Sequence, residues 1–142
     1  MPFETFTADL FRARETEFLS IAADIPSDYW AREHFLAELP EKWRLSFALL
    51  EEDMAVGYAI MSRPEQNCVH LHHFMLRASH RGGGRGGLMI DECLHRAIVA
   101  GAQYLSLKIA ANSLRAQRFY VRHGFVEARR EENYLRLERP LF

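Results

Sequence analysis

The sequence has 142 residues, 49% of them hydrophobic, with a formal net charge of -1. This length suits a single domain spanning residues 1–142, because each half of a divided chain would be too small to bury enough apolar surface. The near-zero charge excludes the broad positive field that nucleic-acid binding requires, so we expect no nucleic-acid partner.

The first predicted elements in chain order are a short apolar entry and two helices. After residues 3–6, apolar residues recur at mixed spacings of three and four over residues 8–23, which favours a helix ending before Pro26. Ser27 suits the N-cap of a second helix that continues through Leu39, with Pro40 just past its end.

Alternating patterns then indicate strands. Residues 45–49 and 56–60 alternate on either side of the polar turn 51–53, as in a hairpin. A further strand over residues 69–76 ends near Arg77, and strict alternation along it would direct His73 to the face opposite His70 and His72.

The second half of the chain mixes helices and strands. A glycine cluster at residues 82–87 leads into an amphipathic helix that stops at Gly101. A strand over 105–109, a helix over 113–123 and strands over 125–128 and 134–137 complete the chain. This order predicts an α/β (α+β) fold.

The glycine cluster is the strongest candidate site. It lies between a strand and a helix, where unpaired N–H groups and the helix dipole favour an anion such as a pyrophosphate, and Arg81 and Arg85 add charge. The alternative is a flexible surface loop. A dinucleotide site would need an acidic residue that residues 109–112 lack, and a phosphate-binding Walker loop would need a Lys after Gly86 or Gly87.

Two motifs resemble the GCN5-related N-acetyltransferase (GNAT) superfamily. The run from Arg81 to Gly86 matches its Q/R-x-x-G-x-G/A signature. The later helix matches a second signature at Asn112, Ala116, Phe119, Tyr120, Gly124 and Phe125. One departure is Ala78, where many members have proline.

The resemblance implies a GNAT fold, with a mixed central sheet of six to seven strands flanked by four helices. It also implies that acetyl-coenzyme A is the co-substrate. By similarity, its pantetheine arm would bind the backbone of Phe74, Met75 and Leu76, and Asn112 would contact that arm. Tyr120 would lie near the sulfur as general acid. The pyrophosphate would bind the cluster Arg81, Gly82, Gly83, Gly84, Arg85, Gly86 and Gly87.

His70 and His72 are candidates for removing the proton of the acceptor amine, because histidine titrates near neutrality. The pair resembles the His-x-His of the arylalkylamine N-acetyltransferase branch, which is thought to relay the proton through water. Two alternatives remain open: hydrogen-bonded structural histidines, and a metal site. We expect no metal, because a zinc site needs three or four ligands and no Cys, Asp or Glu stands at useful spacing.

The resemblance places the acceptor between the first two helices, where Tyr29 and Trp30 either line an aromatic pocket or belong to the core. We expect direct transfer of acetyl to the primary amine of a small molecule, without an acyl-enzyme. The alternatives are an N-terminal or lysine protein acetyltransferase and a non-catalytic acyl-coenzyme A sensor. A homodimer is left open.

The expected location is the cytoplasm. Cys68 and Cys93 have no CxxC spacing, and residues 1–4 lack the basic and apolar regions of a signal peptide. Because the apolar runs are far shorter than a bilayer span, we expect no membrane partner.

Overall fold

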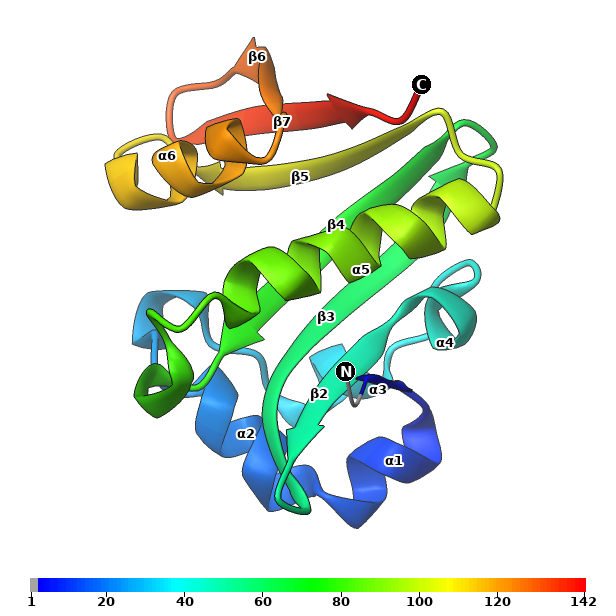
Figure 1. Cartoon of the computed structure of the whole chain (residues 1–142), viewed down its shortest axis with the longest axis vertical. Helices are drawn as coiled ribbons and strands as arrows, with labels where there is room; N and C mark the ends of the chain where they lie inside the picture. Colours follow the sequence, from blue (N-terminus) through cyan, green and yellow to red (C-terminus); the bar gives the residue numbers. More distant parts are fainter. Residues whose placement is uncertain (1–2) are drawn as a thin grey trace.

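The computed structural model describes residues 3–142, so Met1 and Pro2 of the amino-terminal segment discussed above lie outside it. Within this range the chain forms a seven-stranded mixed sheet in the order β1-β2-β3-β4-β5-β7-β6 (Figure 1). Neighbouring strands are antiparallel except β4 and β5, which are parallel. The predicted fold class is confirmed. The strands are β1 Phe3–Thr5, β2 Phe47–Glu51, β3 Met54–Glu65, β4 Cys68–Leu76, β5 Tyr104–Ala110, β6 Val126–Arg130 and β7 Tyr134–Pro140.

The described residues contain six α-helices where four were expected. The predicted helix over 8–23 is divided into α1 (Ala8–Ala13) and α2 (Glu15–Ala22), because Arg14 has a non-helical backbone at φ -130° and ψ 30°. The other two long helices lie close to their expected ranges, as α5 (Arg85–Val99) and α6 (Leu114–Arg122). A short 3-10 turn, η2 (Ala78–His80), precedes α5.

The predicted helix over 27–39 is also wrong. The chain instead forms the 3-10 turn η1 (Pro26–Asp28), α3 (Arg32–Leu36) and α4 (Lys42–Leu45). The fully buried Lys42 ammonium donates hydrogen bonds to the Phe35 and Ala37 carbonyls at 2.6 and 2.7 Å. These bonds satisfy carbonyls that the end of α3 leaves free, so the chain can turn there.

Two hydrophobic clusters cover the two faces of the sheet. One lies between the sheet and α5, which crosses that face in Figure 1, and includes Met89, Cys93 and Tyr120. The other joins the opposite face to α1, α2 and α3 through Phe11, Phe18 and similar buried side chains. The sheet is therefore the middle layer of three.

The sheet opens between β4 and β5. Their ladder extends from the pair Cys68 and Tyr104 to the pair Leu71 and Leu107, and no later residues pair. The two strands diverge toward the side where α6 and the start of α5 lie (Figure 1). The β5-facing backbone edge of residues 72–76 therefore has no strand partner, although it lies in the middle of the sheet.

A β-bulge changes the expected direction of one histidine. Ile60 pairs with His73 and Met61 pairs with Leu71, so His72 has no opposite residue in β3. Because the extra residue reverses the alternation, His73 lies on the same face as His70 and His72. The prediction that His73 faces away from the other two was wrong.

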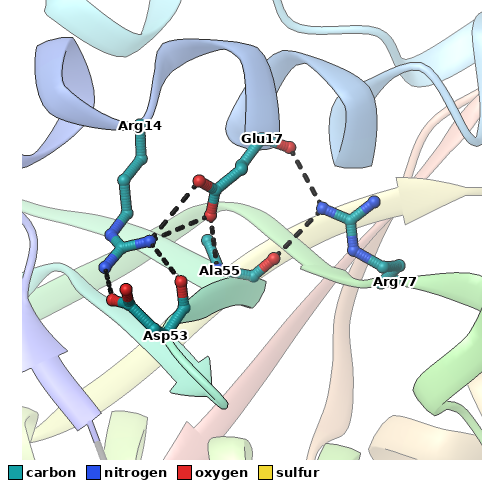
Figure 2. Close-up of polar contacts among 5 residues, drawn as sticks. All are labelled: Arg14, Glu17, Asp53, Ala55 and Arg77. Atoms are coloured by element: carbon teal, nitrogen blue, oxygen red, sulfur yellow. Dashed lines mark hydrogen bonds and ion pairs between the residues drawn. The ribbon is translucent and has the colours of Figure 1, made fainter.

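A polar network fixes the chain where β4 leads toward the glycine cluster (Figure 2). The Glu17 carboxylate accepts hydrogen bonds from Arg14 at 3.2 Å and from the Ala55 amide at 2.6 Å. Arg14 also pairs with Asp53 at 2.6 Å. Arg77, directly after β4, donates to the carbonyls of Ala55 and Glu17 at 3.1 and 3.4 Å. The start of the loop is thus tied to both α2 and β3.

Candidate active site

A groove of about 900 Å³ opens where β4 and β5 separate. One wall is the end of β4, including Phe74, Met75 and Leu76, and the glycine cluster and first turn of α5 form its end. The facing wall is α6, which contributes Tyr120. The groove therefore brings the predicted pantetheine edge, phosphate loop and acid together.

The glycine end of the groove suits an anion. Gly84 is the N-cap of α5 and no side chain caps that helix, so the first amides of α5 are free to bind a ligand. Gly82 and Gly84 both have φ of +86°, a conformation that other residues rarely adopt.

Gly86 and Gly87 have a packing role as well. A Cβ atom at Gly86 would lie 3.2 Å from the Phe119 ring, and one at Gly87 would lie 3.4 Å from the His123 ring. These two glycines let α6 approach the first turn of α5 closely. The phosphate loop and the α6 wall are thereby held together.

Only some of the residues that were predicted to contact coenzyme A border the groove. Arg81 borders the groove, and its Nε donates to the Leu76 carbonyl at 2.8 Å. Arg85 instead forms a two-pronged pair with Glu51 at 2.7 and 2.9 Å. Gly83, Arg85 and Asn112 are not among the residues that border the groove, and Ser113 borders it where Asn112 was expected.

Tyr120 lines the groove and is only 9% exposed. Its ring makes edge-on contacts with Phe125 at 5.4 Å and Phe74 at 6.4 Å. Burial is the main cause that raises the pKa of Tyr120, and the nearby Asp28 carboxylate acts in the same direction. The phenol is therefore protonated at neutral pH and can donate to an anion in the groove.

His70 and His72 form a neighbouring pair, with ring centroids 4.8 Å apart, on the sheet face covered by α1, α2 and α3. His70 Nδ1 is 2.7 Å from the Ser106 hydroxyl, and His72 Nε2 is 2.6 Å from the Ser62 hydroxyl. Burial is the main cause that lowers the pKa of each to about 4. Neither borders the groove, and both are neutral at pH 7.

A cluster around His73 was not predicted from the sequence. Its Nδ1 is 2.7 Å from the Tyr58 hydroxyl, and its Nε2 lies 2.8 Å from the Asp28 carbonyl and 3.3 Å from the Asp28 carboxylate. The apolar spacing of Val69, Leu71 and Phe74 is two and then three, which was an available signal for the bulge. No sequence pattern indicated Asp28.

The two aromatic residues predicted for the acceptor side differ in exposure. Trp30 is half-buried and stacks on His73 with ring centroids 4.7 Å apart. Tyr29 is 44% exposed. Ile25, at the start of the same loop, borders the groove beside the end of β4, so this loop reaches the site.

Among residues 3–142, no three or more His, Cys, Asp or Glu side chains are arranged to hold a metal ion. In the same range, no helix combines the length and the apolar character needed to cross a bilayer.

The family model described as the acetyltransferase (GNAT) family matches residues 7–125. The chain therefore belongs to the GNAT acetyltransferase family, whose acyl donor is acetyl-coenzyme A. The arylalkylamine branch is not distinguished by this match. No curated protein matches the chain.

Solved structures share the fold over nearly the whole chain. Ard1 from Thermoplasma volcanium is 18% identical with a TM-score of 0.84, covering 99% of this chain and 97% of its own. The ribosomal-protein-S18-alanine N-acetyltransferase from Escherichia coli is 17% identical with a TM-score of 0.83, covering 98% and 92%. A chain of the NatC complex bound to Gag peptide and CoA is 14% identical with a TM-score of 0.80, covering 99% and 98%.

Proposed function

We propose that this chain transfers acetyl from acetyl-coenzyme A directly to a primary amine, with Tyr120 as the general acid. The observation that carries this proposal is the position of a buried, protonated phenol on a groove that also contains an unpaired strand edge and a free helix N-terminus. The phenol suits the thiol of coenzyme A, the strand edge suits its amide arm, and the helix N-terminus suits its pyrophosphate. The three features follow one another in the same order as these groups do in coenzyme A.

Acetyl-coenzyme A supplies a reactive thioester, and the chain's own residues bind and polarise it. Free amides on β4 near Met75 pair with the amide arm, and one of them stabilises the negative charge that develops on the thioester oxygen. The Tyr120 hydroxyl donates a proton to the departing thiolate. Cys93 is fully buried in the core and has a raised pKa, so it is not available as the nucleophile of an acyl-enzyme.

The acceptor arrives as an ammonium ion and must lose a proton before attack. His70 and His72, with the hydroxyls of Ser106 and Ser62, offer a path that passes the proton on through water. Replacing both histidines by Ala should move the pH–rate profile to higher pH, because the rate would then depend on amine that is already deprotonated. An unaltered profile would leave the pair with a structural role.

For the acceptor class, we favour the terminal amine of a peptide over the small amine that the sequence suggested. On the sheet face that carries His70 and His72, helices pack over β3 and β4, whereas Tyr134, at the start of β7 on that face, is 51% exposed. This open surface supports an extended acceptor. Two of the similar structures, an S18-alanine acetyltransferase and a peptide-bound complex, support the same choice.

The test is a thiol-release assay with acetyl-coenzyme A and a panel of amines. It should include peptides with free and blocked amino termini, lysine-containing peptides, arylalkylamines and polyamines. We expect turnover with free peptide amino termini and none with blocked ones. Turnover only with small amines would restore the small-molecule assignment. Binding of acetyl-coenzyme A without turnover on any amine would instead support a non-catalytic sensor.

A further inference from the structure

Three arginines of α6 have no protein partner among residues 3–142. Arg115, Arg118 and Arg122 are exposed, border the groove, and take part in no ion pair or side-chain hydrogen bond within residues 3–142. Every other arginine in that range forms an ion pair or donates a side-chain hydrogen bond. The unpaired guanidinium groups are thus concentrated on one wall of the active-site groove.

This arrangement does not stabilise the helix. Spacings of three and four put the three arginines on neighbouring positions of one helix face, and α6 (Leu114–Arg122) contains no acidic residue to offset them. Arg115 also lies in the first turn, where the helix dipole disfavours a positive charge. An anionic ligand in the groove would compensate both repulsions.

The position of α6 identifies which part of the ligand reaches these side chains. Phe119 and His123 pack against Gly86 and Gly87, so α6 passes directly beside the proposed pyrophosphate site. We therefore expect the nucleotide beyond the pyrophosphate to lie along the groove side of α6. In coenzyme A that nucleotide carries a 3′-phosphate, a monoester with a charge of about -2 at neutral pH. Guanidinium groups bind such a phosphate through paired hydrogen bonds.

We propose that Arg115, Arg118 and Arg122 bind the 3′-phosphate of coenzyme A and so select it over its dephospho form. This inference rests on the proposed use of acetyl-coenzyme A and adds a specificity site to it. The glycine loop binds the pyrophosphate, which both forms share, whereas the α6 arginines sense the group that distinguishes them.

The test is calorimetric titration of the whole chain with coenzyme A, 3′-dephospho-coenzyme A and adenosine 3′,5′-bisphosphate. Wild-type protein should bind coenzyme A about tenfold or more tightly than the dephospho form. The double variant Arg115→Gln/Arg118→Gln should lose this preference by weakening coenzyme A binding, with dephospho-coenzyme A binding changed less than about threefold. Arg122→Gln should act in the same direction. Arg12→Gln on α1 removes one charge far from the groove and should change neither affinity.

Other outcomes would overturn the inference. Equal wild-type affinity for the two forms, or variants that weaken both forms alike, would exclude a 3′-phosphate site while leaving the acetyltransferase proposal intact. Altered acceptor KM with unchanged coenzyme A selectivity would assign the arginines to the acceptor. No binding of either form would contradict the proposed function itself. Thermal unfolding provides a folding control, because Arg115→Gln should not lower the Tm.

Discussion

Burial of Tyr120 favours the protonated phenol that the proposed chemistry uses. A phenol that faced solvent would have the ordinary pKa near 10, whereas this one lies among Phe74, Phe119 and Phe125 with a raised pKa. It therefore keeps its proton across the physiological pH range. The same burial leaves the ring well packed, so a phenylalanine would fit in its place.

Replacing Tyr120 by Phe should reduce kcat by about 100-fold or more, because only the proton donor is lost. The affinity for coenzyme A, measured by calorimetry, should change by less than about threefold. Tyr104→Phe, at the distant start of β5, is the matched control. Unchanged turnover in Tyr120→Phe would remove the acid assignment.

His70 and His72 should make the fold sensitive to acid. Their pKa values are lowered from 6.5 to about 4 in the folded state, so the unfolded chain binds more protons between those pH values. The free energy of unfolding should therefore fall as the pH drops from 6.5 to 4, by about 2 kcal/mol per histidine after allowance for partial exposure.

Urea denaturation at pH 7, 5 and 4 measures this dependence. The double variant His70→Gln/His72→Gln should show a weaker loss of stability on acidification than wild type. The exposed His95, on α5, provides the control variant His95→Gln. An equally steep loss in the double variant would mean that these histidines titrate normally in the folded protein.

The elements around the groove depend on close helix contact. Gly86→Ala would place a methyl group 3.2 Å from the Phe119 ring and push α6 away from α5. We expect about a tenfold loss of coenzyme A affinity, because the α6 wall moves away from the glycine end of the groove. Gly83→Ala is the control, since a Cβ there meets only the end of the flexible Arg85 side chain. Equal affinities of the two variants would contradict the packing role of Gly86.

At the same scale, the sequence predicted elements with a sustained pattern and missed those set by tertiary contacts. The apolar period of α5 and the glycine at position 101 were sufficient to predict that helix from the sequence. The break at Arg14 and the turn held by Lys42 depend on partners distant in sequence, such as Asp53, or on backbone carbonyls. The local periodicity of the sequence gives no information about either of these contacts.

The candidate site divides in the same way. The glycine loop and Tyr120 could be predicted because motifs mark them, and they meet at one groove. The cluster of His73 with Asp28 and Tyr58 joins three separate segments, so no local pattern revealed it. The sequence also could not show that the α6 arginines are unpaired, because the partners of the other arginines are known only from the structure.

For the whole molecule, function follows from one departure from a regular sheet. If β4 and β5 had stayed paired beyond Leu71 and Leu107, the mid-sheet edge and the groove would not exist. The bulge at His72 occurs on the diverging part of β4. Just after this strand, Arg77 is tied to Glu17 and Ala55 (Figure 2). The central claim is that a thioester binds in this opening beside Tyr120.

A crystal structure of the chain with coenzyme A tests that claim most directly. We predict that the amide arm pairs with residues 74–76 of β4, and that the sulfur lies within hydrogen-bond distance of the Tyr120 hydroxyl. Coenzyme A bound elsewhere, or with its sulfur remote from that hydroxyl, would contradict the account.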